Sequence, residues 1–277
     1  MKTEKYVICD TNVWYRLGEP SMYSKIEGYL EGRKLLITQL SYFELMTSRK
    51  LINNFEAVKF ANIAINKYAI VSLKNDIEQV LLELNVPFYK SEAVYVKNVI
   101  NEINSSVIGV ADFDSIKINL KQEISRREEK TEKIASEYQN KIECWRKKKN
   151  ISKKHIRKCV VMQLKKDVML YLFRHRMLSF RAIAEVLCKN FISVVFDLYV
   201  TCFTEFLWNL VQSNGSNKMS FKPNDYIDFR NLLFCTHESK YLTLEKATNQ
   251  KIGGILHRYG RRYELENAEE IKNILNS

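Results

Sequence analysis

Two carboxylates in this sequence directly follow short apolar runs, and both could take part in chemistry. Asp10 follows Tyr6–Cys9 (YVIC), and Glu245 follows Tyr241–Leu244 (YLTL). If these runs are parallel strands, both side chains project into the crevice at the carboxyl ends of the sheet, where such sheets bind ligands. By itself, Asp10 is equally typical of a residue that caps the following helix.

Three further carboxylates belong to helical patterns. Glu44 lies one turn into the pattern that begins at Ser41. Asp225 and Asp228 are three residues apart at the start of another helical pattern, so they face the same side of it. Each has a simpler interpretation: Glu44 is an exposed helical residue, and the two aspartates offset the helix dipole with Asn224 as the cap.

Together, these carboxylates predict a metal site. Like charges that converge repel one another unless a cation neutralises them. Ligands that are all oxygen favour Mg²⁺ or Mn²⁺ over zinc. Such an ion can orient a water molecule and stabilise the leaving oxygen of a phosphodiester. Repulsion at this site also predicts that Asp10→Asn would keep or raise the stability of the metal-free protein.

Four short apolar runs alternate with helical patterns, which predicts an α/β fold with a mostly parallel sheet of four or five strands. The runs are Tyr6–Cys9, Lys34–Thr38, Ala69–Leu73 and Tyr241–Leu244. Gly260–Leu265 is the predicted fifth strand, at an edge. From residue 91 to 211, nearly all of the sequence is typical of helices.

Short motifs in four segments are similar to those of the PIN-domain nucleases. V-I-C-D-T-N-V-W resembles the family's opening strand, and L-L-I-T-Q-L-S-Y-F-E-L resembles its second segment, which ends in a helical Glu. P-N-D-Y-I-D-F-R-N-L-L-F-C and K-Y-L-T-L-E-K resemble its acidic helix and closing strand.

The resemblance implies a role for each residue of the site. The metal-binding positions fall on Asp10, Glu44, Asp228 and Glu245, with Asp225 as a second carboxylate on its helix. The supporting positions fall on Thr11, Asn12 and Thr243. Glu245 stands where the family usually has Asp, so it would reach one methylene further.

The resemblance covers residues 1–88 and 222–277, which implies a discontinuous PIN-like nuclease domain. Residues 89–221 are then a basic, all-α insertion that the resemblance does not explain. Within it, Lys117–Cys144 carries acidic-to-basic pairs such as Glu123/Arg127 at the i,i+4 spacing of an exposed helix.

A more apolar helix is predicted over Ala182–Val211. Asp197 and Glu205 fall inside its most apolar window, so a buried helix is favoured over a membrane span. Asp197, Thr201 and Glu205 form a polar stripe on this helix. We expect the stripe to pair with basic residues of neighbouring helices, and the alternative is that it borders the active-site cleft.

The net charge of +12 is concentrated between Cys144 and Arg181, where thirteen basic residues face a single acidic one, Asp167. Such a block predicts contact with a phosphate backbone, and RNA is favoured over DNA. An acidic partner protein or a merely solvated face would also explain it. The predicted nucleic-acid-binding residues are Arg146, Lys147, Lys148, Lys149, Lys153, Lys154, Arg157 and Lys158.

The 6 cysteines show no CxxC spacing, which fits a reduced compartment in which most of them are small buried hydrophobes. The first twenty residues show no signal segment. We therefore expect a cytoplasmic protein without a membrane partner.

The favoured function is a metal-dependent endoribonuclease. A DNA or flap-structure nuclease would use the same carboxylates, and a catalytically decayed module would only bind nucleic acid. A metal-independent HEPN-type ribonuclease would instead use Arg230 and His237, which lie in R-N-L-L-F-C-T-H. Family habit alone suggests toxin–antitoxin systems or phage defence. An inhibitory protein partner and a homo-oligomer stay open.

Overall fold

The computed structural model describes residues 6–19, 22–30, 32–72, 74–86, 113–148, 150–177, 179–187, 194–235, 239–244 and 252. The chain divides into two compact units. The sheet unit takes residues 1–75, 90–129 and 235–277, and the helical unit takes residues 76–89 and 130–234. These units are groupings by packing, and the predicted domain boundaries at residues 88 and 222 stay a prediction.

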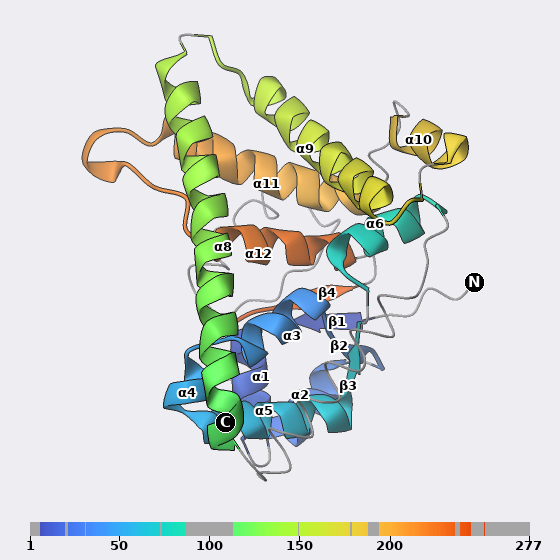
Figure 1. Ribbon diagram of the computed structural model, residues 1–277, viewed down its shortest axis with the longest axis vertical. Helices are drawn as coiled ribbons and strands as arrows, with labels where there is room; N and C mark the ends of the chain where they lie inside the picture. The colour runs from blue at the N-terminus through green and yellow to red at the C-terminus, as the bar shows by residue number, and fades with distance from the viewer. Residues whose placement is uncertain are drawn as a thin grey trace. The chain divides into compact units, whose positions relative to one another are not determined.

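The sheet unit contains a four-stranded parallel sheet, so the predicted α/β class with a parallel sheet flanked by helices is confirmed (Figure 1). Its strands are β1 (Tyr6–Cys9), β2 (Lys34–Ile37), β3 (Ala69–Val71) and β4 (Lys240–Leu242). Val7 pairs with Leu35 on one side and with Lys240 on the other. The predicted fifth strand, Gly260–Leu265, lies outside the described residues.

The strand order β3-β2-β1-β4 fixes where a ligand would bind. The chain first steps from β1 to β2 and β3 in one direction, and β4 is then added on the other side of β1. The order therefore reverses between β1 and β4. In open parallel sheets, the crevice beyond the carboxyl ends of the two strands at such a reversal is the usual ligand site.

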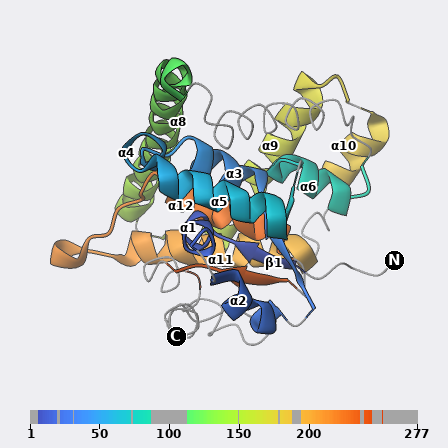
Figure 2. The ribbon, with the colours of Figure 1, turned by 90° about the horizontal axis from the view of Figure 1, so that it is seen from below.

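The helices of the sheet unit pack against these strands. They are α1 (Thr11–Leu17), α2 (Met22–Leu30), α3 (Gln39–Met46), α4 (Lys50–Asn53), α5 (Phe55–Tyr68) and the first half of α8 (Phe113–Lys147). Fully buried Val7, Trp14 and Ile37 belong to one core cluster. Helices α1 and α5 lie side by side (Figure 2). Gly18 permits this close approach, since a Cβ there would lie 2.6 Å from the Ala61 nitrogen.

The described residues of the helical unit form helices joined by loops, which confirms the helical prediction for those up to residue 211. The unit contains α6 (Asp76–Glu83), the second half of α8, α9 (Lys153–Arg174), α10 (Phe180–Leu187), α11 (Val194–Gln212) and α12 (Asp225–Asn231), with 3₁₀ turns η1 (Gly215–Asn217) and η2 (Leu232–Phe234). The helix predicted over Ala182–Val211 corresponds to α10 and α11, and residues 188–193 between them lie outside the described residues. Among the described helices, none has the length and apolarity that a membrane crossing requires.

The polar stripe of α11 is paired with basic residues of α9, which confirms the favoured interpretation of that stripe. Arg157 donates to Asp197 Oδ1 at 2.7 Å and to Thr201 Oγ1 at 3.1 Å. Lys153 Nζ forms an ion pair with Glu205. The carboxylates that interrupt this apolar helix therefore fasten it to its neighbour.

Candidate functional site

Asp10 lies at the reversal of strand order, directly after β1. Its backbone is extended (φ −68°, ψ 159°), and Oδ1 accepts a hydrogen bond from the Thr11 backbone N–H at 2.7 Å, so it does cap α1. Oδ2 accepts from Asn12 Nδ2 at 2.8 Å and from Thr243 Oγ1 at 2.9 Å. Because the residue is only 4% exposed, these donors stabilise a carboxylate that has largely left water.

Asn12 and Thr243 tie the end of β4 to the end of β1. Thr243 is fully buried and follows β4 directly. Asn12 donates to Asp10 through its amide nitrogen, and its amide oxygen accepts from the Leu244 backbone N–H at 2.8 Å. The orientation of the Asp10 carboxylate is thus set from both strands. The supporting positions taken from the family resemblance do contact Asp10.

Glu44 comes close to this carboxylate through a shared neighbour. It lies in α3, which begins after Thr38, whose hydroxyl caps the helix by accepting from the Ser41 N–H at 3.1 Å. Thr11 Oγ1 donates to Glu44 Oε2 at 2.7 Å, while the backbone N–H of the same residue donates to Asp10. Thr11 therefore joins the carboxylate after β1 to the one after β2.

Arg127 of α8 also borders the site, and the sequence pattern did not predict this. Its Nη1 lies 3.9 Å from Glu44 Oε1. Its Nε and Nη1 are buried without a hydrogen-bond partner in the part of the chain that the structure describes. The predicted i,i+4 partner of Arg127, Glu123, instead pairs with Arg126 at 2.5 Å. An i,i+4 pattern cannot reveal a partner on another helix.

A neighbouring ion pair fastens this part of α8 to the sheet unit. Arg49 forms a two-pronged ion pair with Glu128, through Nε at 2.8 Å and Nη2 at 2.9 Å. Ile124 is buried, with 4% of its surface exposed. Tyr15 lies near the same charges: burial raises the pKa of its hydroxyl, and Glu44 raises it further. Its Oη lies 2.9 Å from Ser48 Oγ.

Asp225 and Asp228 open α12 in the helical unit, as predicted, and both are buried. Asp225 accepts a hydrogen bond from the Lys222 backbone N–H at 2.6 Å. Asn224 occupies the cap position, as in the simpler interpretation, but its side chain makes no cap hydrogen bond.

The convergence of all five carboxylates stays a prediction. Asp10 and Glu44 are joined in the sheet unit, whereas the two aspartates belong to the helical unit. Glu245 lies outside the described residues. Over the described residues, no group of three or more His, Cys, Asp or Glu side chains is close enough to hold a metal ion.

Several basic residues between Cys144 and Arg181 form ion pairs with acidic residues that lie outside this segment. Arg146 donates to Glu143 and to the carbonyl oxygens of Leu210 and Met219, and its side chain is 10% exposed. Lys153 and Arg157 are paired with α11. The interpretation of the block from its single acidic residue is therefore wrong for these three residues, because their partners, Glu143 and residues of α11, lie outside the segment from Cys144 to Arg181. Four of the predicted contact residues are exposed, Lys147, Lys148, Lys154 and Lys158, and Lys149 lies outside the described residues.

Arg230, which the HEPN-type alternative would use, is enclosed in the helical unit. Its side chain is 3% exposed and forms ion pairs with Asp76 and, at 3.0 Å, with Asp167. Its guanidinium lies 5.4 Å from the ring centroid of Tyr226. These contacts are those of a structural cation. His237 lies outside the described residues.

Comparison with known proteins gives no relative: no protein-family model, no curated protein and no solved structure matches this chain.

Proposed function

We propose that this protein is a metal-dependent endoribonuclease with a PIN-like active site at the carboxyl ends of β1 and β4. The observation that carries the proposal is the joining of Asp10 and Glu44 through Thr11, at the point where the strand order reverses. Parallel sheets bind their ligands in this crevice. The finer assignment, a PIN-like fold with residues 89–221 inserted, rests on the motifs in the sequence and on this topology.

The donor types at this site fit a hard divalent cation. Asp10 and Glu44 offer carboxylate oxygens, and the neighbouring Thr11 and Thr243 side chains offer hydroxyl oxygens. Mg²⁺ and Mn²⁺ favour such oxygen ligands. In the proposal, Asp10 and Glu44 hold the ion, and the roles of Asp225, Asp228 and Glu245 as further ligands are carried over from the family resemblance alone. When bound, the ion would supply an activated water and stabilise the leaving oxygen of a phosphodiester.

The protein's own residues have a separate task, which is to orient the two carboxylates. Asn12 and Thr243 fix Asp10 from the β4 side, and Thr11 sets its position relative to Glu44. Fixed donors of this kind hold a ligand in its productive orientation. Arg127, with two buried N–H groups beside Glu44, supplies positive charge at the same edge. A guanidinium there suits the anionic backbone of a nucleic acid.

RNA is the proposed substrate class, and the net charge of +12 supports a polyanion. Its proposed contacts are the exposed lysines Lys147, Lys148, Lys154 and Lys158. A cytoplasmic location and a role in toxin–antitoxin systems or phage defence belong to the proposal as well, as do an inhibitory partner and a homo-oligomer. The enclosure of Arg230 by two carboxylates disfavours the HEPN-type alternative, because that guanidinium is committed to ion pairs.

The test is a map of cleaved ends on RNA and DNA of one sequence, with Mg²⁺ or with EDTA. Hydrolysis by a metal-positioned water does not use the ribose 2′-hydroxyl, so we expect RNA ends without a 2′,3′-cyclic phosphate and no cleavage in EDTA. Cyclic phosphate ends that persist in EDTA would support the HEPN-type alternative. Cleavage of DNA alone would support a DNA nuclease, and binding without cleavage would support a decayed module.

A further inference from the structure

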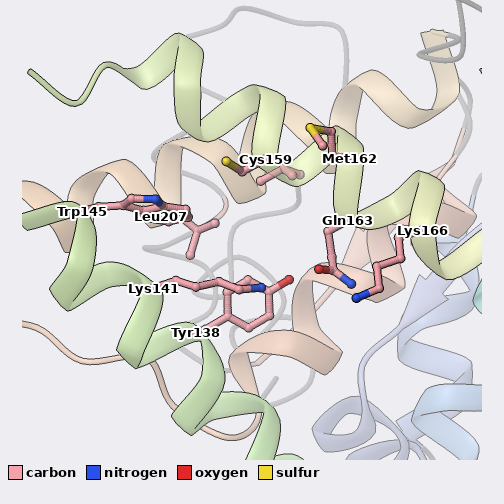
Figure 3. A pocket seen from close by; sticks show the side chains of 9 residues that line it. Tyr138, Lys141, Trp145, Cys159, Met162, Gln163, Lys166 and Leu207 are labelled. Atoms are coloured by element: carbon pink, nitrogen blue, oxygen red, sulfur yellow. The ribbon is translucent and has the colours of Figure 1, made fainter. Parts of the chain in front are cut away.

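A cavity of about 410 Å³, open to solvent, lies within the helical unit between α8, α9 and α11, and none of the residues that line it was assigned above to the metal site (Figure 3). Its walls are Tyr138, Lys141 and Trp145 of α8, Cys159, Val160, Met162, Gln163 and Lys166 of α9, and Leu207 of α11. The volume falls in the range of small-ligand pockets, which is roughly 300–1,000 Å³. Exposed Met162 lies at its solvent side, whereas Trp145 and Val160 are buried in its wall.

One end of the cavity is apolar. Figure 3 shows Trp145 and Leu207 together at this end, with Cys159 above them. Trp145 is 7% exposed and Leu207 is fully buried, so both are fixed by the core and form a rigid wall. An aromatic ring beside a branched aliphatic side chain accommodates a flat apolar group.

The other end gathers polar groups. Gln163 and Lys166 extend toward Tyr138 in Figure 3. Gln163 donates its amide N–H to Asp167 Oδ1 at 2.9 Å. The Lys141 ammonium lies 4.9 Å from the centroid of the Tyr138 ring. Burial raises the pKa of the Tyr138 hydroxyl well above its usual value, so this group remains an O–H donor at neutral pH.

The charge at the polar end is positive. Lys141 and Lys166 contribute two ammonium groups, and none of the nine lining residues is acidic. The nearby carboxylate of Asp167 is already paired with Arg230 at 3.0 Å. A ligand that complements both ends therefore carries one anionic group and an apolar body.

We propose that this cavity binds a small amphipathic anion, whose flat apolar body lies against Trp145 and Leu207 and whose acidic group lies between Lys141 and Lys166. The site goes beyond the proposed nuclease and does not depend on it. Its polar groups are few and lie at one end, as in pockets that bind an apolar body and orient it through a single head group.

Two probes of one shape test the proposal: 8-anilino-1-naphthalenesulfonate, which is anionic, and N-phenyl-1-naphthylamine, which lacks the sulfonate. Each is titrated into the 277-residue chain, and energy transfer from its 3 tryptophans to the probe reports binding, with Trp145→Phe showing how much of the signal comes from Trp145. We expect one saturable site that prefers the anionic probe. Lys166→Gln should lower the affinity for the anionic probe by roughly tenfold or more, because a charged hydrogen-bond partner is lost. The affinity for the neutral probe should stay unchanged.

Two further variants complete the experiment. Lys133→Gln removes an exposed charge of α8 that does not line the cavity and should bind both probes as the wild type does. Cys159→Phe places a larger side chain in the cavity and should lower the affinity for both probes. Equal affinity of the wild type for the two probes, or equal effects of Lys166→Gln and Lys133→Gln, would overturn the proposal. Undiminished binding by Cys159→Phe would also overturn the proposal, provided that circular dichroism shows the variant to be folded. If that variant does not fold, the two lysine variants still test the proposal.

Discussion

Replacing Asp10 with Asn removes one charge and leaves the shape of the side chain almost unchanged, yet we expect it to destabilise the sheet unit. Repulsion between carboxylates predicted the opposite when only the sequence was considered. The hydrogen bonds around Asp10 change that expectation. Its two oxygens accept from three donors: the Thr11 backbone N–H, Asn12 Nδ2 and Thr243 Oγ1.

An amide has one acceptor oxygen and one donor nitrogen, so it cannot serve all three donors. If the amide oxygen faces the Thr11 N–H, the amide nitrogen meets Asn12 Nδ2, which is also a donor. If the amide is reversed, its nitrogen meets the Thr11 N–H instead. One buried donor loses its acceptor in either case, which costs about 1–3 kcal/mol. The remaining bonds also lose their charge assistance.

Hydrogen–deuterium exchange of peptides from α1 and β4, in EDTA, measures this change within the sheet unit. A loss of about 2 kcal/mol should speed their exchange by roughly thirtyfold. Glu27→Gln makes the same chemical change on an exposed residue of α2 and should leave the exchange unaltered. Unchanged or slower exchange in Asp10→Asn would refute the reasoning, because it would mean that repulsion outweighs the three donors.

Three further predictions concern the charges. Arg230→Met should destabilise the helical unit by about 3–5 kcal/mol in urea unfolding, because two carboxylates lose their buried partner. The control is Arg157→Met, which should cost less than about 1 kcal/mol because its ion pair is partly exposed. Hydrogen bonds from Arg49 lower the pKa of Glu128. The ion pair therefore stabilises the α8 contact above pH about 4.3, and this stabilisation is lost as the pH falls through the lowered pKa. The difference in hydrogen–deuterium exchange of α8 between the wild type and Glu128→Gln should vanish in acid. Replacing four exposed lysines with Gln should lower the salt dependence of RNA binding by up to roughly 0.7 per lysine, and an unchanged slope would remove them from the interface. The four are Lys147, Lys148, Lys154 and Lys158.

The strands and the position of Asp10 could be predicted from the sequence because they depend on local patterns. A run such as Tyr6–Cys9 must be buried, and a polar residue that follows it must lie at the end of the strand. The predicted runs overlap all four strands of the sheet, with ends that differ by one or two residues. Thr243 could be placed only through the family resemblance, since nothing in its own segment reveals a contact with Asp10.

The partners of basic side chains could not be predicted in the same way. Arg127 and Arg146 belong to a helix whose sequence is full of charges, so many pairings are equally consistent with it. Arg146 does have a local partner, Glu143, but its contacts with the carbonyl oxygens of Leu210 and Met219, like the contact of Arg127 with Glu44, join residues that are distant in the sequence. Long side chains reach whatever the tertiary structure brings near them, and a periodic pattern carries no information about that.

The most direct test of the central claim is the rate of RNA cleavage as Mg²⁺ is titrated, measured in parallel for the wild type, Asp10→Asn and Glu27→Gln. A metal held by Asp10 predicts cleavage that rises with Mg²⁺ in the wild type and in Glu27→Gln. In Asp10→Asn we expect a rate at least about a hundredfold lower, since even the loss of a group that only supports a ligand costs roughly 10–100-fold. Cleavage by Asp10→Asn at the wild-type rate, with the same dependence on Mg²⁺, would contradict the account.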